Sequence, residues 1–131
     1  MMEKQRAKEI LDDFTGINIL VVGDVMLDEY VWGKVSRVSP EAPVMVIDAD
    51  HHTFVPGGAA HVVTNVCALG ASASITGVIG HDSAGLTLIE KLAEEGAAIG
   101  GLIESPSRPT TLKTRVIAHS QQGSQQVLRV D

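Results

Sequence analysis

Apolar residues cluster along this chain in short runs that predict strands. Ile17–Gly23 and Ser72–Ile79 are apolar runs of strand length. The first is apolar on both faces, which predicts a central strand of a parallel sheet. Ala98–Ile103 predicts a further short strand, and Leu112–His119 alternates in the manner of a half-buried strand. A loop over residues 121–126 then predicts a hairpin into a last strand from Val127.

Between these strands the apolar spacing changes to that of helices. Glu3–Phe14 predicts an amphipathic helix, and Ala59–Leu69 predicts a mostly apolar helix that is closed by Gly70. Asp82 is a candidate N-cap for a third helix that ends at Gly96. The apolar stripe of this third helix is expected to contain Leu86, Ile89, Leu92 and Ala93. Strands that alternate with helices predict an α/β fold.

Two segments of mixed polarity do not fit a buried sheet. Val31–Val38 and Val44–Asp50 predict short strands of a small second sheet. Such a sheet has exposed edges, which favour pairing with another strand. We therefore expect this sheet either to pair with a second copy of the chain or to fold over a pocket.

Composition and charge exclude several classes of function. The chain has 131 residues and a net charge of −6, which argues against nucleic acid and anionic membranes as partners. No apolar run approaches the roughly 20 residues of a membrane span. The N-terminus lacks a signal-peptide core, and the single cysteine, Cys67, cannot form an internal disulfide. These features predict a cytoplasmic protein.

The segment from Pro56 to Asn65 contains the most informative chemistry. Gly57 and Gly58 directly precede the predicted helix and allow a ligand to approach the backbone closely. The helix N-terminus would present unpaired N–H groups and the positive end of its dipole. This pattern predicts a site for a polar molecule rich in oxygen, although a glycine pair alone also fits a plain turn.

Two carboxylates follow the first predicted strand. Asp24 lies where the strand ends, and ligands of open α/β sheets collect at that edge. Asp24 could accept hydrogen bonds from sugar hydroxyls or cap a turn. Asp28 lies four residues later and would share its face if the segment formed a helical turn. We interpret Asp28 as a second hydroxyl acceptor rather than a metal ligand.

The order of the motifs resembles the N-terminal half of the ribokinase (PfkB) family of carbohydrate kinases. Within that family the resemblance is greatest to the kinases that phosphorylate heptose 7-phosphate. It covers the chain from about Ile17 to Asp131. The segments that match best, besides the glycine pair, are Gly23–Asp28, Ser39–Val44, Pro109–Arg115 and Gln125–Asp131.

The resemblance implies a ribokinase-like parallel-sheet sandwich with a small β lid at about residues 31–50. Residues 1–131 would form only the N-terminal, acceptor-binding part of one kinase domain. The complete enzyme would transfer the γ-phosphoryl group of ATP, with Mg²⁺, to a phosphorylated sugar. The family's glycine-rich anion hole and its catalytic aspartate have no counterpart here, so we expect the general base and the ATP site beyond Asp131, and no catalytic residue in this chain.

The resemblance also assigns substrate-binding roles. His61 replaces the asparagine that the family usually has at this place, whereas Asn65, one turn later, is retained. Lys113 and Arg115 match the heptose kinases and, at i and i+2, share one strand face. They could bind the phosphate that the sugar already carries, or lie solvated on an exposed face. The complete set of expected binding residues is Asp24, Asp28, Gly57, Gly58, His61, Asn65, Lys113 and Arg115.

Other functions are compatible with parts of the pattern. A related kinase could act on fructose, ribose or a nucleoside, and a non-catalytic sugar-binding or assembly module could retain the lid and acceptor pocket. A Rossmann dehydrogenase fits poorly because Gly-x-Gly-x-x-Gly does not follow the first strand. The histidines show no spacing typical of metal ligands, so no metal site is predicted.

Overall fold

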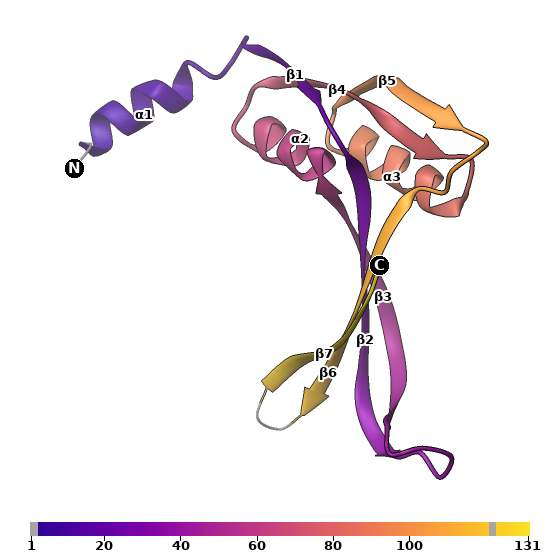
Figure 1. Ribbon diagram of the computed structural model, residues 1–131. Coiled ribbons are helices and arrows are strands. Elements are labelled where there is room, and N and C mark those ends of the chain that lie inside the picture. The colour runs from indigo at the N-terminus through magenta and orange to yellow at the C-terminus, as the bar shows by residue number, and fades with distance from the viewer. Residues whose placement is uncertain (1–2, 121–122) are drawn as a thin grey trace. The chain divides into compact units, whose positions relative to one another are not determined.

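The structure, a computed structural model, describes residues 3–120 and 123–131. The chain forms two compact units (Figure 1). The α/β unit contains the residues up to Leu27 together with Pro56–Thr111, and the β unit contains Asp28–Val55 and Leu112–Asp131. None of the described helices has the length and apolar character needed to cross a bilayer.

The α/β unit is built on a parallel sheet of three strands in the order β1-β4-β5. The strands are β1 (Asn18–Val22), β4 (Ser72–Gly80) and β5 (Ala98–Ser105), and the helices are α1 (Lys4–Asp12), α2 (Ala59–Ala68) and α3 (Ser83–Glu94). All six elements match the sequence predictions to within a few residues. The predicted α/β class and parallel pairing are therefore confirmed.

One face of this sheet packs against α2 and α3 (Figure 1). Ile75 and Ile79 of β4 are fully buried there, as are Leu88 and Leu92 of α3. Burial of such a side chain contributes roughly 1.5–3 kcal/mol to folding. The expected stripe of α3 was partly wrong: Leu86 is 60% exposed, because Leu88 and Leu92 lie on the face that meets the sheet.

The opposite face of the sheet is apolar and exposed. Leu20 and Val22 of β1 are 65% and 71% exposed, and Ile103 of β5 is 61% exposed. The prediction of a central first strand is wrong for the described sheet, in which β1 pairs only with β4 and forms one edge. The apolar character of both faces of β1 is therefore not explained by burial within this unit.

Glycines permit the turn into α2. Gly58 precedes the helix with φ of +56°, and a Cβ placed on it would lie 2.5 Å from the carbonyl oxygen of Asp24. The same carbonyl accepts a hydrogen bond of 2.8 Å from the N–H of Ala59. The helix ends before Gly70, which has φ of +92°. The glycine signals at both ends of this helix are thus confirmed.

Asp82 fixes the start of α3 and a distant loop together. Its carboxylate accepts a hydrogen bond from the N–H of Gly85, as predicted for an N-cap, and another from the N–H of Thr110, both 2.8 Å long. The buried hydroxyl of Thr110 accepts a hydrogen bond of 2.8 Å from the N–H of Gly80. No side chain fits at Gly80 or Gly85, where a Cβ would lie within 2.6 Å of backbone atoms.

The second sheet has four strands in the order β3-β2-β6-β7. They are β2 (Val25–Val38), β3 (Met45–Gly58), β6 (Thr111–Ser120) and β7 (Gly123–Val130). The expected small second sheet is present, but the predicted span of residues 31–50 was too short, because β2 and β3 each have 14 residues and β6 and β7 join them. Half-exposed strands lack the continuous apolar signal that marks strand ends in a buried sheet.

Two local expectations for these strands need correction. Asp28 lies within β2, so the helical turn that would bring it next to Asp24 does not form. The last strand begins at Gly123 rather than Val127, and pairs with β6 in antiparallel register. Gln121 and Gln122 of the predicted hairpin loop lie outside the described residues.

We expect Asp82→Ala to lower the free energy of unfolding by about 1–2 kcal/mol at pH 7, because the helix cap and the bond to Thr110 are both lost. Urea unfolding of the chain measures this change. Asp24→Ala is the matched control, since the Asp24 side chain has no hydrogen bond within the described structure. Equal losses from the two substitutions would contradict the role of Asp82.

The effect of Asp82 should depend on pH. The hydrogen bonds from Thr110 and Gly85 lower the pKa of the Asp82 carboxyl. Its stabilisation is therefore complete above the unfolded-state pKa of about 3.9 and is lost as the pH falls through the lower folded-state value. The stability difference between wild type and Asp82→Ala should shrink below about pH 4. A difference that persists unchanged at the lowest pH tested would contradict this account.

Candidate functional site

The candidate site of the α/β unit begins where its parallel strands end. Gly23 and Asp24 follow β1, and the N–H of Gly23 donates to the carbonyl oxygen of Thr76 on β4 at 3.3 Å. A side chain at Gly77 would lie 2.7 Å from the carbonyl oxygen of Gly23, so the two strands approach closely here. This is the edge at which open α/β sheets bind ligands.

Asp24 combines a fixed backbone with an uncommitted side chain. Its carbonyl oxygen is held by the N–H of Ala59 at the start of α2. Its carboxylate is exposed and forms no hydrogen bond or ion pair with any residue that the structure describes. The side chain therefore caps no turn, and all its acceptor positions are available to a ligand.

Gly57 and Gly58 lie at the end of β3, next to Asp24 rather than in a separate loop. Gly57 is buried, and Gly58 approaches the backbone of Asp24 and the side chain of Met26. Only Gly58 of this pair has positive φ. The structure thus brings Asp24 and the start of α2 together.

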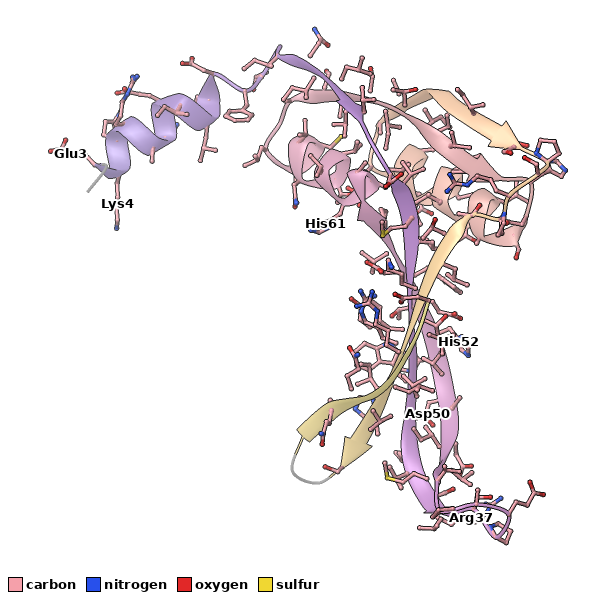
Figure 2. All side chains as sticks on the ribbon, in the orientation of Figure 1. Glu3, Lys4, Arg37, Asp50, His52 and His61 are labelled. Carbon is pink, nitrogen blue, oxygen red and sulfur yellow. The ribbon has the colours of Figure 1, made fainter. Side chains whose placement is uncertain are left out.

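His61 and Asn65 lie one turn apart on α2 and are both exposed. The buried residues of this helix, Ala60 and Val63, face the core instead. Figure 2 shows His61 directed away from the sheet. Neither polar side chain has a hydrogen bond within the described structure, so both are available to a ligand.

A hollow of about 240 Å³ lies beside Asp24, within the α/β unit. Its lining consists of Val22, Gly23, Asp24, Thr76, Gly77, Val78, Ile103 and Arg108. The glycine pair, His61 and Asn65 are not part of this lining. Asp24 and Arg108 are its charged residues. Arg108 was absent from the residues predicted from the sequence, where a lone arginine before a proline gives no distinctive signal.

The other predicted binding residues belong to the β unit. Arg115 pairs with Asp28 at 2.6 Å, and both side chains are about one-fifth exposed. The guanidinium of Arg115 also lies 5.3 Å from the ring centre of Tyr30, a cation–π distance. Asp28 is therefore an ion-pair partner of Arg115 in this structure, and its carboxylate is not free for a hydroxyl.

Lys113 is also paired with a carboxylate. Its ammonium group lies 3.2 Å from Asp131, which additionally accepts two bonds from Arg129 at 2.7 and 2.8 Å. The hydrogen bonds from Arg129 and Lys113 lower the pKa of Asp131 to about 2. The two cations predicted to hold a phosphate thus already have anionic partners.

Trp32 lies at the centre of an aromatic row on the same unit. Its ring stacks between His51 at 5.9 Å and His119 at 5.5 Å, and Tyr30 stacks on it at 6.0 Å. The indole N–H donates to the Thr53 hydroxyl at 2.8 Å. Such cross-strand stacking stabilises a sheet that is half exposed.

Comparison with curated proteins gives close relatives. The chain is 45% identical over 130 residues to the bifunctional protein HldE of Citrifermentans bemidjiense. The match covers 99% of this chain and 26% of that protein. It is 52% identical over 113 residues to HldE of Helicobacter hepaticus. This match covers 86% of the chain and 23% of the HldE protein. The chain thus spans about a quarter of the length of these relatives.

Solved structures show the same fold. A carbohydrate kinase from Agrobacterium tumefaciens superposes with a TM-score of 0.68 at 20% identity, over 87% of this chain and 34% of that chain. A ribokinase from Cryptococcus neoformans, solved with ADP, superposes with a TM-score of 0.56 at 25% identity. That match covers 86% of this chain and 34% of the ribokinase chain. The ribokinase-like fold expected for this portion is therefore confirmed.

The family model for pfkB family carbohydrate kinases matches residues 17–128, which is most of the chain. The matched segment contains both the Asp24 hollow and the start of α2. The chain belongs to the pfkB family of carbohydrate kinases.

Proposed function

We propose that this chain is the acceptor-binding part of an ATP-dependent sugar kinase that phosphorylates heptose 7-phosphate. The observation that carries the proposal is the uncommitted carboxylate of Asp24, which lines a hollow at the carboxyl ends of parallel strands. The family supports a sugar as the acceptor. The identity to HldE proteins supports the heptose.

The proposed roles follow from the chemistry of each group. Asp24 accepts hydrogen bonds from sugar hydroxyls, which are stronger because the acceptor is charged. Gly58 is exposed, so the sugar can approach the backbone there, whereas Gly57 is buried and supports the turn into α2. His61 and Asn65 each offer a donor or acceptor from the exposed side of α2.

Asp28, Lys113 and Arg115 form a second proposed group, on the β unit. Binding of a substrate phosphate by Lys113 or Arg115 requires the anion to displace Asp131 or Asp28. Asp28 likewise binds a hydroxyl only when Arg115 has released it. These three residues therefore carry a cost of rearrangement that Asp24 does not.

When bound, Mg-ATP supplies the phosphoryl group, and catalysis depends mainly on positioning and charge stabilisation. The residues that the structure describes contain no cluster of three His, Cys, Asp or Glu side chains suited to a metal ion. The part of the site that we propose for this chain is the acceptor site.

We expect Asp24→Asn to weaken binding of heptose 7-phosphate to the chain by roughly tenfold to a hundredfold, because charge-assisted hydrogen bonds worth about 1.5–3 kcal/mol are lost. Isothermal calorimetry measures the affinity, and a thermal melt measures stability. The melting temperature should change little, since no described residue bonds to the carboxylate. Asp48→Asn, a substitution of an exposed carboxylate on β3, is the control.

The same two measurements separate the alternatives for Asp24. A lower melting temperature with unchanged affinity would make Asp24 a structural residue and remove it from the site. Stronger binding of fructose, ribose or a nucleoside than of heptose 7-phosphate would assign the chain to another ribokinase-like kinase.

We expect the 131-residue chain alone to have no kinase activity on any sugar, because no catalytic base is assigned to it. A coupled assay for ADP release, with a complete HldE protein as positive control, tests this. ADP formation by the purified chain that depends on the sugar would contradict the expectation.

We also propose that the β unit mediates a homodimer. Strands β3 and β7 lie at the two edges of its sheet, and an exposed edge is a template for pairing with another chain. Sedimentation velocity over a range of concentrations should reveal a dimer. A monomer at every concentration would overturn this proposal without affecting the acceptor site.

A further inference from the structure

Arg108 is a cation without an anionic partner. The only hydrogen bond of its guanidinium, among residues 3–120 and 123–131, is a long one of 3.5 Å to the hydroxyl of Thr111. It forms no ion pair with a described carboxylate, unlike Lys113 and Arg115. In a chain of net charge −6, an arginine without a carboxylate partner is a feature that attracts an incoming anion.

The loop that carries Arg108 is held in place from both sides. Pro109 fixes its own φ and restricts Arg108 to an extended conformation. Thr110 is buried, and Asp82 and Gly80 both hydrogen-bond to it. The Ser105 hydroxyl accepts a hydrogen bond of 3.3 Å from the N–H of Ser107 on the other side. The base of the arginine side chain is therefore positioned before any ligand binds.

Arg108 lines the same hollow as Asp24. The hollow thus combines an uncommitted carboxylate, suited to hydroxyl groups, with an uncommitted guanidinium, suited to a phosphate. Its volume of about 240 Å³ is below that of sites for drug-sized ligands and suits a small molecule. A phosphorylated monosaccharide has both kinds of group in one small molecule.

We propose that Arg108 binds the phosphate that the acceptor sugar already carries, and so selects phosphorylated over unphosphorylated sugars. This inference rests on the proposed function, and names the specificity residue of that site. Arg108 also lines a second hollow with His81 and Asp82. There each oxygen of Asp82 already accepts one backbone N–H group, so its carboxylate is less available to sugar hydroxyls than that of Asp24.

The other cations that could bind the phosphate are already paired with carboxylates. Arg115 lies 2.6 Å from Asp28, and Lys113 shares Asp131 with Arg129. A phosphate at either position must break an existing ion pair, whereas at Arg108 it breaks only the long bond to Thr111. Arg108 offers a bidentate contact without that competition.

The test is calorimetry of the chain with two probes, heptose 7-phosphate and the same heptose without its phosphate. Wild type should bind the phosphorylated sugar more tightly. Arg108→Gln should weaken that binding roughly tenfold to a hundredfold, and should leave the affinity for the unphosphorylated sugar within about twofold, because only the charge-assisted contact is removed. Arg108→Lys keeps the charge but loses the bidentate fork, and should show an intermediate loss.

Lys91→Gln is the matched control, since it removes one cation of the α/β unit that does not line the hollow. It should leave the phosphate preference unchanged. A thermal melt of each variant confirms that it folds. Loss of the preference in Lys113→Gln or Arg115→Gln, but not in Arg108→Gln, would overturn the inference. So would an equal loss for both sugars in Arg108→Gln, or a loss confined to binding of Mg-ATP.

Failure of the inference can be distinguished from failure of the proposed function. If wild type binds both sugars equally, the acceptor site stands and the role of Arg108 is wrong. If wild type binds neither sugar, both the proposed function and the role of Arg108 are wrong.

Discussion

The carboxylate of Asp82 is the contact on which the arrangement of the α/β unit depends. It joins two segments 28 residues apart, because it caps α3 and also holds the N–H of Thr110. The first bond fixes the helix that covers the sheet. The second fixes the loop after β5, and with it the position of Arg108. Gly80 and Gly85 are needed because any side chain there would occupy the space of this junction. A structural carboxylate thus positions a residue of the proposed site.

Two aspartates at strand ends therefore have opposite roles. Asp24 and Asp82 follow β1 and β4, which are neighbours in one parallel sheet. The oxygens of Asp82 are occupied by backbone N–H groups, whereas those of Asp24 have no partner among the described residues. The difference lies in the backbone: at β1 the carbonyl of Asp24, rather than its side chain, receives the N–H that begins α2. Because the carbonyl accepts this hydrogen bond, the carboxylate of Asp24 stays available for ligand binding.

The sequence predicted the α/β unit well because its signals are local. A glycine after a helix, an aspartate before one and a short apolar run each act within a few residues. The β unit was harder to predict, since its long strands are half exposed and paired across the chain. The partners of Asp28, Lys113 and Arg115 were not predictable either. An ion pair between residues 28 and 115 leaves no trace in the spacing of either segment.

Arg108 could not be identified as a candidate binding residue from the sequence. Sequence motifs drew attention to the cations of β6, because two charges at i and i+2 share a strand face. Charge alone does not identify an anion site, since a paired cation must first give up its partner and an unpaired one does not. Only the folded chain shows that Arg108 has no carboxylate partner among the described residues. It also shows that this arginine shares a hollow with Asp24, 84 positions earlier in the sequence. Specificity for a phosphorylated sugar can therefore depend on a residue outside the most recognisable motifs.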